Sequence, residues 1–257
     1  MLSRTLELKR DQILVLIMKD FKLKYNSTAL GFGWSLLVPI LSSLVYFFAF
    51  GVIMRFRAPN YLLYLLCGTF FWQFFSNVVT QNGRCLISNA SLLKKTCFER
   101  RLLIWGTFFV ESIHFLLTVP ILFVIMLLYG VKPDLLTLLP NFVVCYGLLT
   151  LFSMGLSYAY AAANIYFRDL ERMVGIIMRL WIYLTPIFIP ETIIPQKYQW
   201  IYVVNPMAGM VRIWRDIFYL PGIHMNLWLQ LLPTCLIVFF MGRWLFMHLE
   251  KRFTDKI

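Results

Sequence analysis

The chain has 257 residues, and 60% of them are hydrophobic. With a mean hydropathy of +0.74, a chain of this length cannot keep its apolar surface away from water, which excludes an ordinary water-soluble protein. The formal net charge is +12, but the basic residues lie in separate segments instead of one stripe, which argues against a nucleic-acid-binding protein.

Residues 1–30 are predicted to form an interfacial amphipathic helix. Lysines occupy some faces of this helix. Five apolar residues recur on the other side at helical spacing: Leu14, Ile17, Met18, Phe21 and Tyr25. This arrangement is typical of a helix that lies in the headgroup plane of a membrane. The alternative is a solvated basic leader that only sets topology. The first 24 residues contain no signal-peptide core, so we expect the first spanning helix to direct insertion.

Six long apolar stretches follow, and each is long enough to be a membrane span. A bilayer core of about 30 Å needs roughly 20 apolar residues at about 1.5 Å rise per residue. The stretches run from Gly33 to Met54, Tyr61 to Asn82, Leu102 to Tyr129, Leu135 to Tyr166, Met173 to Ile189, and Met225 to His248. The sequence therefore predicts an all-α integral membrane protein with six transmembrane helices in a single domain, residues 1–257.

The basic residues between these stretches are distributed unevenly. Seventeen lysines and arginines fall on one side of the predicted membrane and six on the other, with Arg179 inside the fifth stretch. The basic side holds both termini and the second and fourth loops. By the positive-inside rule this side is cytoplasmic, so both termini are predicted to be cytoplasmic.

Residues 84–101 form the larger predicted cytoplasmic loop. Ser88 or Asn89 can cap a short amphipathic helix that continues through Leu92, Leu93 and Lys95. The apolar face of such a helix can bind a groove on a partner protein. The alternative is that the basic residues only hold the loop inside.

A second cytoplasmic segment, Phe167-Arg-Asp-Leu-Glu171, is short and carries both charges. Arg168 can pair with Glu171 three positions later, which contributes only a few tenths of a kcal/mol if the pair is exposed. So small a gain indicates a geometric role, although Arg168 and Arg172 can equally be topology signals.

Three ionisable residues lie inside the predicted spans: Glu111, His114 and Arg179. Each is expected to face protein, headgroups or water, because a charge against lipid costs a few kcal/mol. Glu111 and His114 share one helix face, and Glu111 is predicted to pair with His114 or with Arg179. The further glutamates of a carboxylate-bridged metal site are missing, so no metal site is predicted.

The segment 190–222 after the fifth stretch is too polar to span a membrane and too apolar for an ordinary loop. Its prolines break it into pieces. Two short re-entrant helices that dip into the outer leaflet fit both observations. Irregular backbone at membrane depth is tolerated only against protein or a water-filled cavity, so the segment is expected to cap a pathway.

Five short strings occur in a fixed order along nearly the whole chain. They are Asp20-Phe-Lys-Leu-Lys-Tyr25 leading into Leu30-Gly-Phe-Gly-Trp34 and Pro39, Asn89-Ala-Ser-Leu-Leu-Lys-Lys95 before Phe98, Phe167-Arg-Asp-Leu-Glu171, Thr185-Pro186, and Asn205-Pro206. Together they resemble the permease subunit of type-2 ABC exporters for polysaccharides, Wzm-like O-antigen permeases above all.

The resemblance implies a six-helix half-transporter that forms a homodimer and binds two copies of a separate ATPase, which holds ATP and Mg. It implies export of an undecaprenyl-linked polysaccharide across the bacterial cytoplasmic (inner) membrane. The chain itself is then a transport permease and not an enzyme, with no cofactor of its own. Consistently, it contains no GxxxxGK[ST] phosphate loop.

The resemblance also implies two contacts with the ATPase. The residues that match the coupling helix are Asn89, Ser91, Leu92, Lys94, Lys95 and Phe98, and those of the second contact are Arg168, Asp169 and Glu171. Relatives commonly have proline after the aromatic residue, where this chain has Glu99. The turn after the coupling helix is therefore expected to differ.

Aromatic residues make up 18% of the chain. Sugar rings can stack on aromatic faces without requiring one pattern of linkages, which suits a sliding polymer. Interfacial belts and packing within the bundle are the alternative roles. The candidates for a glycan channel are Phe47, Phe71, Trp72, Phe75, Trp181 and Tyr183.

Other functions remain open at this point. The same class of transporter includes capsule, teichoic acid and small-molecule efflux permeases. An integral membrane glycosyl- or acyltransferase can use Glu111 and His114 as base and acid. Against an enzyme, the chain has no Asp-rich or His-Asp motif in a loop to bind a donor substrate.

Overall fold

The computed structural model describes residues 10–19, 22, 33–55, 59–95, 99–132, 134–189, 195–198, 200–219, 222–251 and 253. Within these ranges every regular element is a helix, and residues 10–19 are also helical. The elements are α2 (Gly33–Tyr46), the π-helix η1 (Phe47–Ile53), α3 (Tyr61–Ser88), α4 (Ala90–Lys95), α5 (Arg100–Leu128), α6 (Leu135–Tyr166), α7 (Leu170–Trp181), the 3-10 helix η3 (Gln196–Tyr198), α8 (Trp200–Val204), α9 (Pro206–Phe218) and α10 (Met225–Glu250).

Five stretches of helix in the described part of the chain are long and apolar enough to cross a membrane. They are Leu36–Ile53, Tyr61–Ser88, Arg100–Leu128, Leu136–Tyr166 and Met225–Glu250. The prediction of an all-helical chain with several membrane spans is confirmed at this level.

The fifth apolar stretch differs from the prediction. Its helix, α7, has only 12 residues, and turns continue from Ile182 to Ile187. At about 1.5 Å per residue such a helix is roughly 18 Å long, short of a core of about 30 Å. The helix ends because Pro186 disfavours helical backbone at Thr185, whose hydroxyl donates to the carbonyl of Trp181 at 3.1 Å.

Helix α3 is the centre of the bundle. In its most apolar window 78% of the residues are buried, against 17% for α10. Helices α6 and α10 approach each other very closely, because a Cβ added at Gly242 would lie 1.9 Å from the carbonyl oxygen of Gly155. Only glycine at both positions permits this approach of two backbones.

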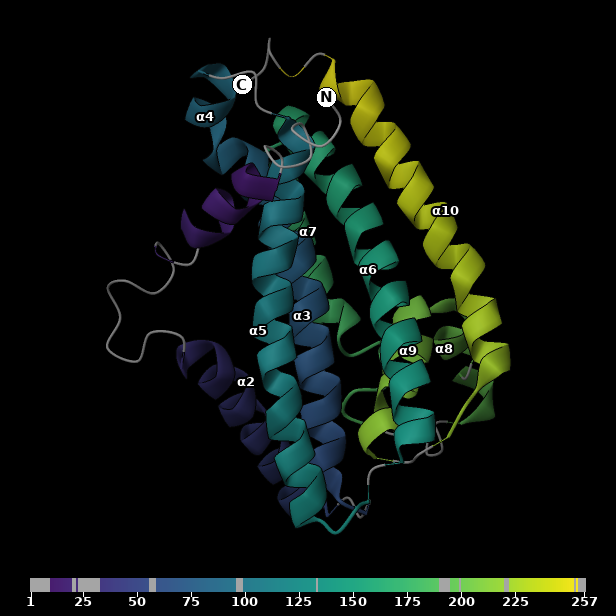
Figure 1. Ribbon diagram of the computed structural model, residues 1–257. Coiled ribbons are helices and arrows are strands. Elements are labelled where there is room, and N and C mark those ends of the chain that lie inside the picture. Colours follow the sequence, from purple (N-terminus) through teal and green to yellow (C-terminus); the bar gives the residue numbers. More distant parts are fainter. Residues whose placement is uncertain are drawn as a thin grey trace.

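Several segments meet at one end of the bundle, which we call the α4 end. Figure 1 shows α4, the helix of residues 10–19 and the last turn of α10 at this end, whereas α9 lies in the opposite half beside α6. Residues 10–19 pack on α5 through buried Leu16, which lies next to Gly106. Most of the predicted interfacial helix, residues 1–9, 20, 21 and 23–30, lies outside the described residues.

The described part of segment 190–222 contains the two short helices α8 and α9, as predicted, after the 3-10 turn η3. In α9, 11 of its 13 residues are buried. Residues 190–194, 199, 220 and 221 lie outside the described part. A segment that is too polar to span a membrane therefore contributes a core helix.

Candidate functional site

The junction between α3 and α4 is held by Asn89, one of the predicted coupling residues. Its side chain donates to the carbonyl of Cys85 at 2.8 Å and accepts from Lys19 Nζ at 2.6 Å. Its backbone carbonyl accepts from the amides of Leu92 and Leu93, which starts α4. Asn89 thus joins the N-terminal helix of residues 10–19 to both α3 and α4.

The apolar side of α4 packs on the chain itself. Leu92 and Leu93 are half-buried against the core, whereas Ser91 is exposed. Ser91 therefore marks the polar side of α4 as the side that the described chain leaves open, and the predicted contact of the apolar face with a partner stays a prediction. Phe98 and the side chains of Lys94 and Lys95 lie outside the described residues.

An ion pair ties the start of α7 to α3. Glu171 lies 3.2 Å from Arg84, and both side chains are about half exposed. The predicted local pair of Glu171 with Arg168 is wrong, because the carboxylate reaches across to the neighbouring helix instead. Arg168 and Asp169 are exposed in the turn that precedes α7.

The start of α5 is tied to the end of α10. Arg100 donates to the backbone carbonyl of Glu250 at 2.8 Å, and Arg101 lies 3.8 Å from the carboxylate of the same residue. Arg100 also lies over the ring of Phe253, 5.6 Å from its centroid. At the α4 end, polar contacts thus connect residues 10–19 to α3, α3 to α7, and α5 to α10.

A second cluster surrounds the turn that ends α7. Arg215 of α9 is only 6% exposed and donates to the carbonyls of Pro186 and Ile187, the latter at 3.0 Å. Its guanidinium also donates to the hydroxyl of Tyr64 at 2.8 Å and lies over that ring, 3.5 Å from its centroid. Gly68 leaves the space, because a Cβ there would be 2.6 Å from the guanidinium.

Asn205 completes this cluster, which we call the Arg215 cluster: Tyr64, Thr185, Pro186, Ile187, Asn205 and Arg215. The side chain of Asn205 accepts from the Met207 amide at 3.1 Å and so caps α9. It also accepts from Trp181 Nε1 at 3.0 Å and donates to the carbonyl of Leu184 at 3.0 Å. The Thr185-Pro186 and Asn205-Pro206 strings, 20 residues apart, therefore form one hydrogen-bonded unit.

Sequence reasoning missed the roles of Tyr64 and Arg215. Arg215 was counted among the charges of the outer side, where it fixes topology. The available signal was its position inside an apolar run, Met207–Phe218, in which a charge must find partners or water.

The intramembrane ionisable residues separate into two places. Glu111 is buried, lies 3.6 Å from Nδ1 of His114, and accepts from the Asn77 amide at 3.1 Å. Arg179 is exposed on α7 and donates to Gly175 of its own helix. Of the two predicted pairs, Glu111 with His114 is confirmed and Glu111 with Arg179 is wrong, because Glu111 is buried beside Asn77 of α3 whereas Arg179 is exposed on α7.

The candidate channel aromatics also separate. Phe71, Trp72 and Phe75 are at most 5% exposed and pack inside the single chain, where Phe75 meets Trp181 edge to face at 5.5 Å. Phe47 is half-buried, and Tyr183 is 61% exposed. Tyr183 is therefore the candidate with an open aromatic surface.

No cluster of three or more metal-ligating side chains occurs among the described residues. Four of the five cysteines, Cys67, Cys85, Cys145 and Cys235, are buried. Burial also raises the pKa of Tyr219, so its hydroxyl stays protonated and donates to the carbonyl of Pro59 at 2.6 Å.

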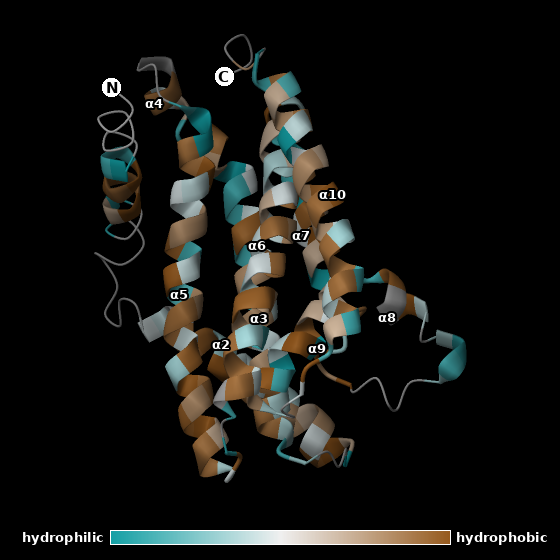
Figure 2. Cartoon of the chain, turned by 45° about the vertical axis from the view of Figure 1, so that its right-hand side comes forward, coloured by the Kyte–Doolittle hydropathy of each residue, from teal (hydrophilic) through white to brown (hydrophobic). Residues whose placement is uncertain are grey.

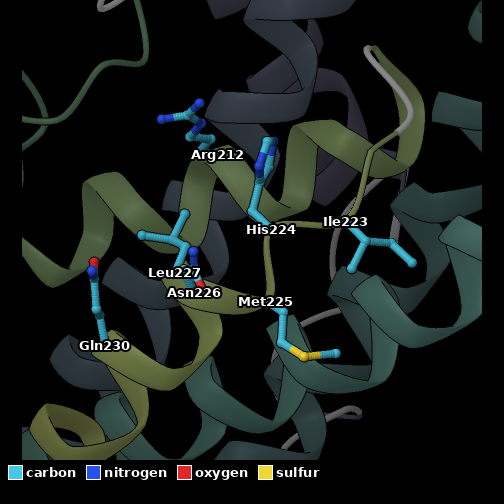
Figure 3. A pocket seen from close by; sticks show the side chains of 7 residues that line it. All are labelled: Arg212, Ile223, His224, Met225, Asn226, Leu227 and Gln230. Atoms are coloured by element: carbon cyan, nitrogen blue, oxygen red, sulfur yellow. The ribbon is translucent and has the colours of Figure 1, made fainter.

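One polar pocket of about 440 Å³ lies between α9 and the start of α10. Figure 3 shows Arg212 and His224 on one side of it and Asn226 and Gln230 on the other. His224 Nε2 lies 3.5 Å from the carboxylate of Asp216. This contact helps to hold the first turn of α10 against α9.

Residues 11–219 match the family described as ABC-2 type transporter. The chain is 34% identical over 245 residues to the O-antigen export system permease protein RfbA of Klebsiella pneumoniae, covering 95% of this chain and 94% of that protein. It is 30% identical over 220 residues to the protein of the same name from Myxococcus xanthus, covering 85% and 84%. The polysialic acid transport protein KpsM of Escherichia coli is 21% identical over 213 residues, covering 82% of each.

Proposed function

The chain belongs to the ABC-2 type transporter family, and from this premise we propose that it is the transmembrane subunit of an exporter for a lipid-linked polysaccharide, O-antigen above all. The observation that carries this proposal is the likeness to O-antigen export permeases over 95% of the chain. The match spans 245 of the 257 residues, so it concerns most of the permease and not one motif.

A capsular polysaccharide is the second candidate substrate. The observation in its favour is the likeness to a polysialic acid transport protein, at the lower identity of 21%. A membrane-bound transferase has no such support. Glu111 and His114, its proposed base and acid, are buried and engaged with each other and with Asn77.

The energy source in this proposal is a separate ATPase that holds ATP and Mg, because this chain has no phosphate loop. Two permease copies and two ATPase copies form the exporter, and the α4 end faces the cytoplasm of a bacterial cell. In support, the α4 end carries Arg84, Arg100 and Arg101 beside the polar side of α4. The ATPase then contacts α4 and the turn at Arg168 and Asp169.

Five spans are long helices, and one further crossing is needed between α6 and α10. We propose that this crossing consists of α7 together with the turn that follows it and the outer segment. The topology supports this. Helix α6 ends at the α4 end, where the Tyr166 hydroxyl donates to the Leu249 carbonyl at 3.2 Å, whereas α10 begins at the opposite end. Between them the chain runs back along the bundle as α7 and the turn that follows it, and α8 and α9 then lie in the half away from the α4 end. In this proposal α8 and α9 are the re-entrant elements.

The proposal is tested by deleting the gene and by purifying the chain after co-expression with its candidate ATPase. We expect loss of surface polysaccharide, accumulation of finished lipid-linked polymer in the cytoplasm, and a 2:2 complex that hydrolyses ATP. Analysis of the accumulated polymer distinguishes O-antigen from capsule. Normal export after deletion would sink the proposal.

A further inference from the structure

Helix α3 exposes a different kind of residue from the other long helices. In the described structure five of its residues are exposed. Four of them are polar, Gln73, Gln81, Arg84 and Ser88, and the fifth is Ile87. Its half-buried residues include Ser76, Asn77 and Thr80. By contrast, the exposed residues of α5 and α10 include large apolar side chains such as Leu116, Leu117, Phe240 and Met241.

The polar residues of α3 lie on one face of the helix. Successive members are separated by one or three positions, so they form a single stripe of about 16 Å at about 1.5 Å per residue. We call this stripe the α3 polar face: Gln73, Ser76, Asn77, Thr80, Gln81 and Arg84. It runs from the middle of the span to the α4 end.

Hydrocarbon is an unsuitable neighbour for this face. An amide that faces lipid keeps donors and acceptors without partners, at a cost of several kcal/mol for each unsatisfied group. Only part of the face is satisfied internally: Gln73 donates to Asn77 at 2.8 Å, and Thr80 bonds back to its own helix. The exposed remainder requires water or another hydrogen-bonding surface.

Two contacts with other helices hold residues of the α3 polar face in place. Asn77 is fixed by its bond to buried Glu111, which lies against His114. At the α4 end the charge of Arg84 is balanced by Glu171 of α7, 3.2 Å away. The exposed surface is thus mostly made of neutral amides and hydroxyls.

We propose that the α3 polar face is the wall of a water-filled path along which the polymer slides. This inference rests on the proposed function and deepens it by naming the residues that contact the substrate. Amides and hydroxyls both donate and accept hydrogen bonds, as sugar hydroxyls do. A neutral wall exchanges such bonds with water and with successive sugar units, so it guides a polymer without holding one unit in place.

The test is the accessibility of single cysteines in the assembled exporter, in membrane vesicles. The native cysteines are replaced, and Gln73→Cys and Gln81→Cys are treated with a membrane-impermeant charged methanethiosulfonate and with lipid-soluble N-ethylmaleimide. The matched controls are Leu116→Cys and Phe109→Cys on α5. They lie at similar depth, because Asn77 contacts Glu111, but their exposed side chains are apolar.

We expect the charged reagent to label both α3 variants and neither α5 variant, whereas N-ethylmaleimide labels the α5 variants. Polymer that is stalled in the exporter should slow labelling on α3. Labelling of α3 by the lipid-soluble reagent alone would overturn the proposal. So would spontaneous disulfides between two Gln81→Cys copies without labelling, because the face would then be a dry contact with a second copy.

The export rate of a second set of variants is an independent measurement, and it does not depend on whether the cysteine variants assemble. We expect Gln81→Leu to lower the export rate roughly tenfold while ATP hydrolysis continues, and Gln81→Asn to stay within about twofold of the parent, since only leucine removes the hydrogen-bonding groups. Equal export by both would overturn the proposal. Cysteine labelling needs no polymer, so failure of the proposed glycan substrate leaves its outcome unchanged and the two failures are distinguishable.

Discussion

The two ends of α7 are held in opposite ways. Its first turn is tied to the bundle by the exposed pair of Glu171 with Arg84, whereas its last turn is enclosed by the buried Arg215 cluster. Exposed ion pairs contribute about 0–1 kcal/mol, but a buried polar group that loses its partner costs about 1–3 kcal/mol. Within the described structure α7 is therefore anchored at its C-terminal end and only weakly held at its N-terminal end, where a cytoplasmic partner is proposed to push.

The largest expected effect comes from Arg215→Met. The carbonyls of Pro186 and Ile187 and the hydroxyl of Tyr64 would lose their donor in a buried site. We expect a loss of about 3 kcal/mol or more in the free energy of unfolding, measured by thermal unfolding in detergent. The control is Arg212→Met, on the exposed side of the same helix. Equal losses in both variants would contradict a buried anchor.

Asn205→Ala is expected to have the next largest effect. It removes the cap of α9 and the acceptor for Trp181 Nε1 together, so we expect a loss of about 2 kcal/mol. Asn205→Ser keeps a capping oxygen, and its loss should be about half as large by the same unfolding measurement. If serine were as damaging as alanine, the links to Trp181 and Leu184 would outweigh the cap.

Glu171→Gln is expected to change stability by less than about 1 kcal/mol, because the pair is half exposed and screened by salt. A double-mutant cycle with Arg84→Gln measures the pair directly. In the assembled exporter the same variant should reduce transport more than it reduces stability, since it releases the start of α7. A stability loss comparable to that of Asn205→Ala would remove the contrast between the two ends.

The smallest expected effect is that of Lys19→Met. Its bond to Asn89 is exposed, so we expect a change of a few tenths of a kcal/mol that diminishes further at high salt. Asn89→Ala is the comparison, because it also removes the bond to Cys85 at the end of α3. If the two variants were equal, Lys19 would carry the whole link.

Much of the helical frame could be predicted because it depends on local patterns. Long apolar runs specify helices wherever they occur in a membrane, so α3, α5, α6 and α10 appear close to their predicted bounds. The fifth run has the same composition but stops at Trp181. Pro186 is a local signal for this end, but the bonds that hold the next turn to Tyr64 and Arg215 come from distant residues, which no local pattern contains.

The site was predicted less completely for the same reason. Asn89 was identified because its role in ending α3 and starting α4 is local. Glu171 was paired with its neighbour in sequence, although its partner Arg84 lies on another helix. The polar residues of α3 at helical spacing were visible in the sequence, but only burial showed that they share the exposed side of a central helix.

The glycine contact between α6 and α10 limits which parts can move. With the carbonyl oxygen of Gly155 1.9 Å from a Cβ built at Gly242, neither helix can slide past the other without a clash of backbones. These two helices form a rigid frame, and Figure 2 shows α10 running alongside α6. Any alternation between open and closed states must therefore be carried by the remaining helices, with α6 and α10 as the fixed reference against which they turn.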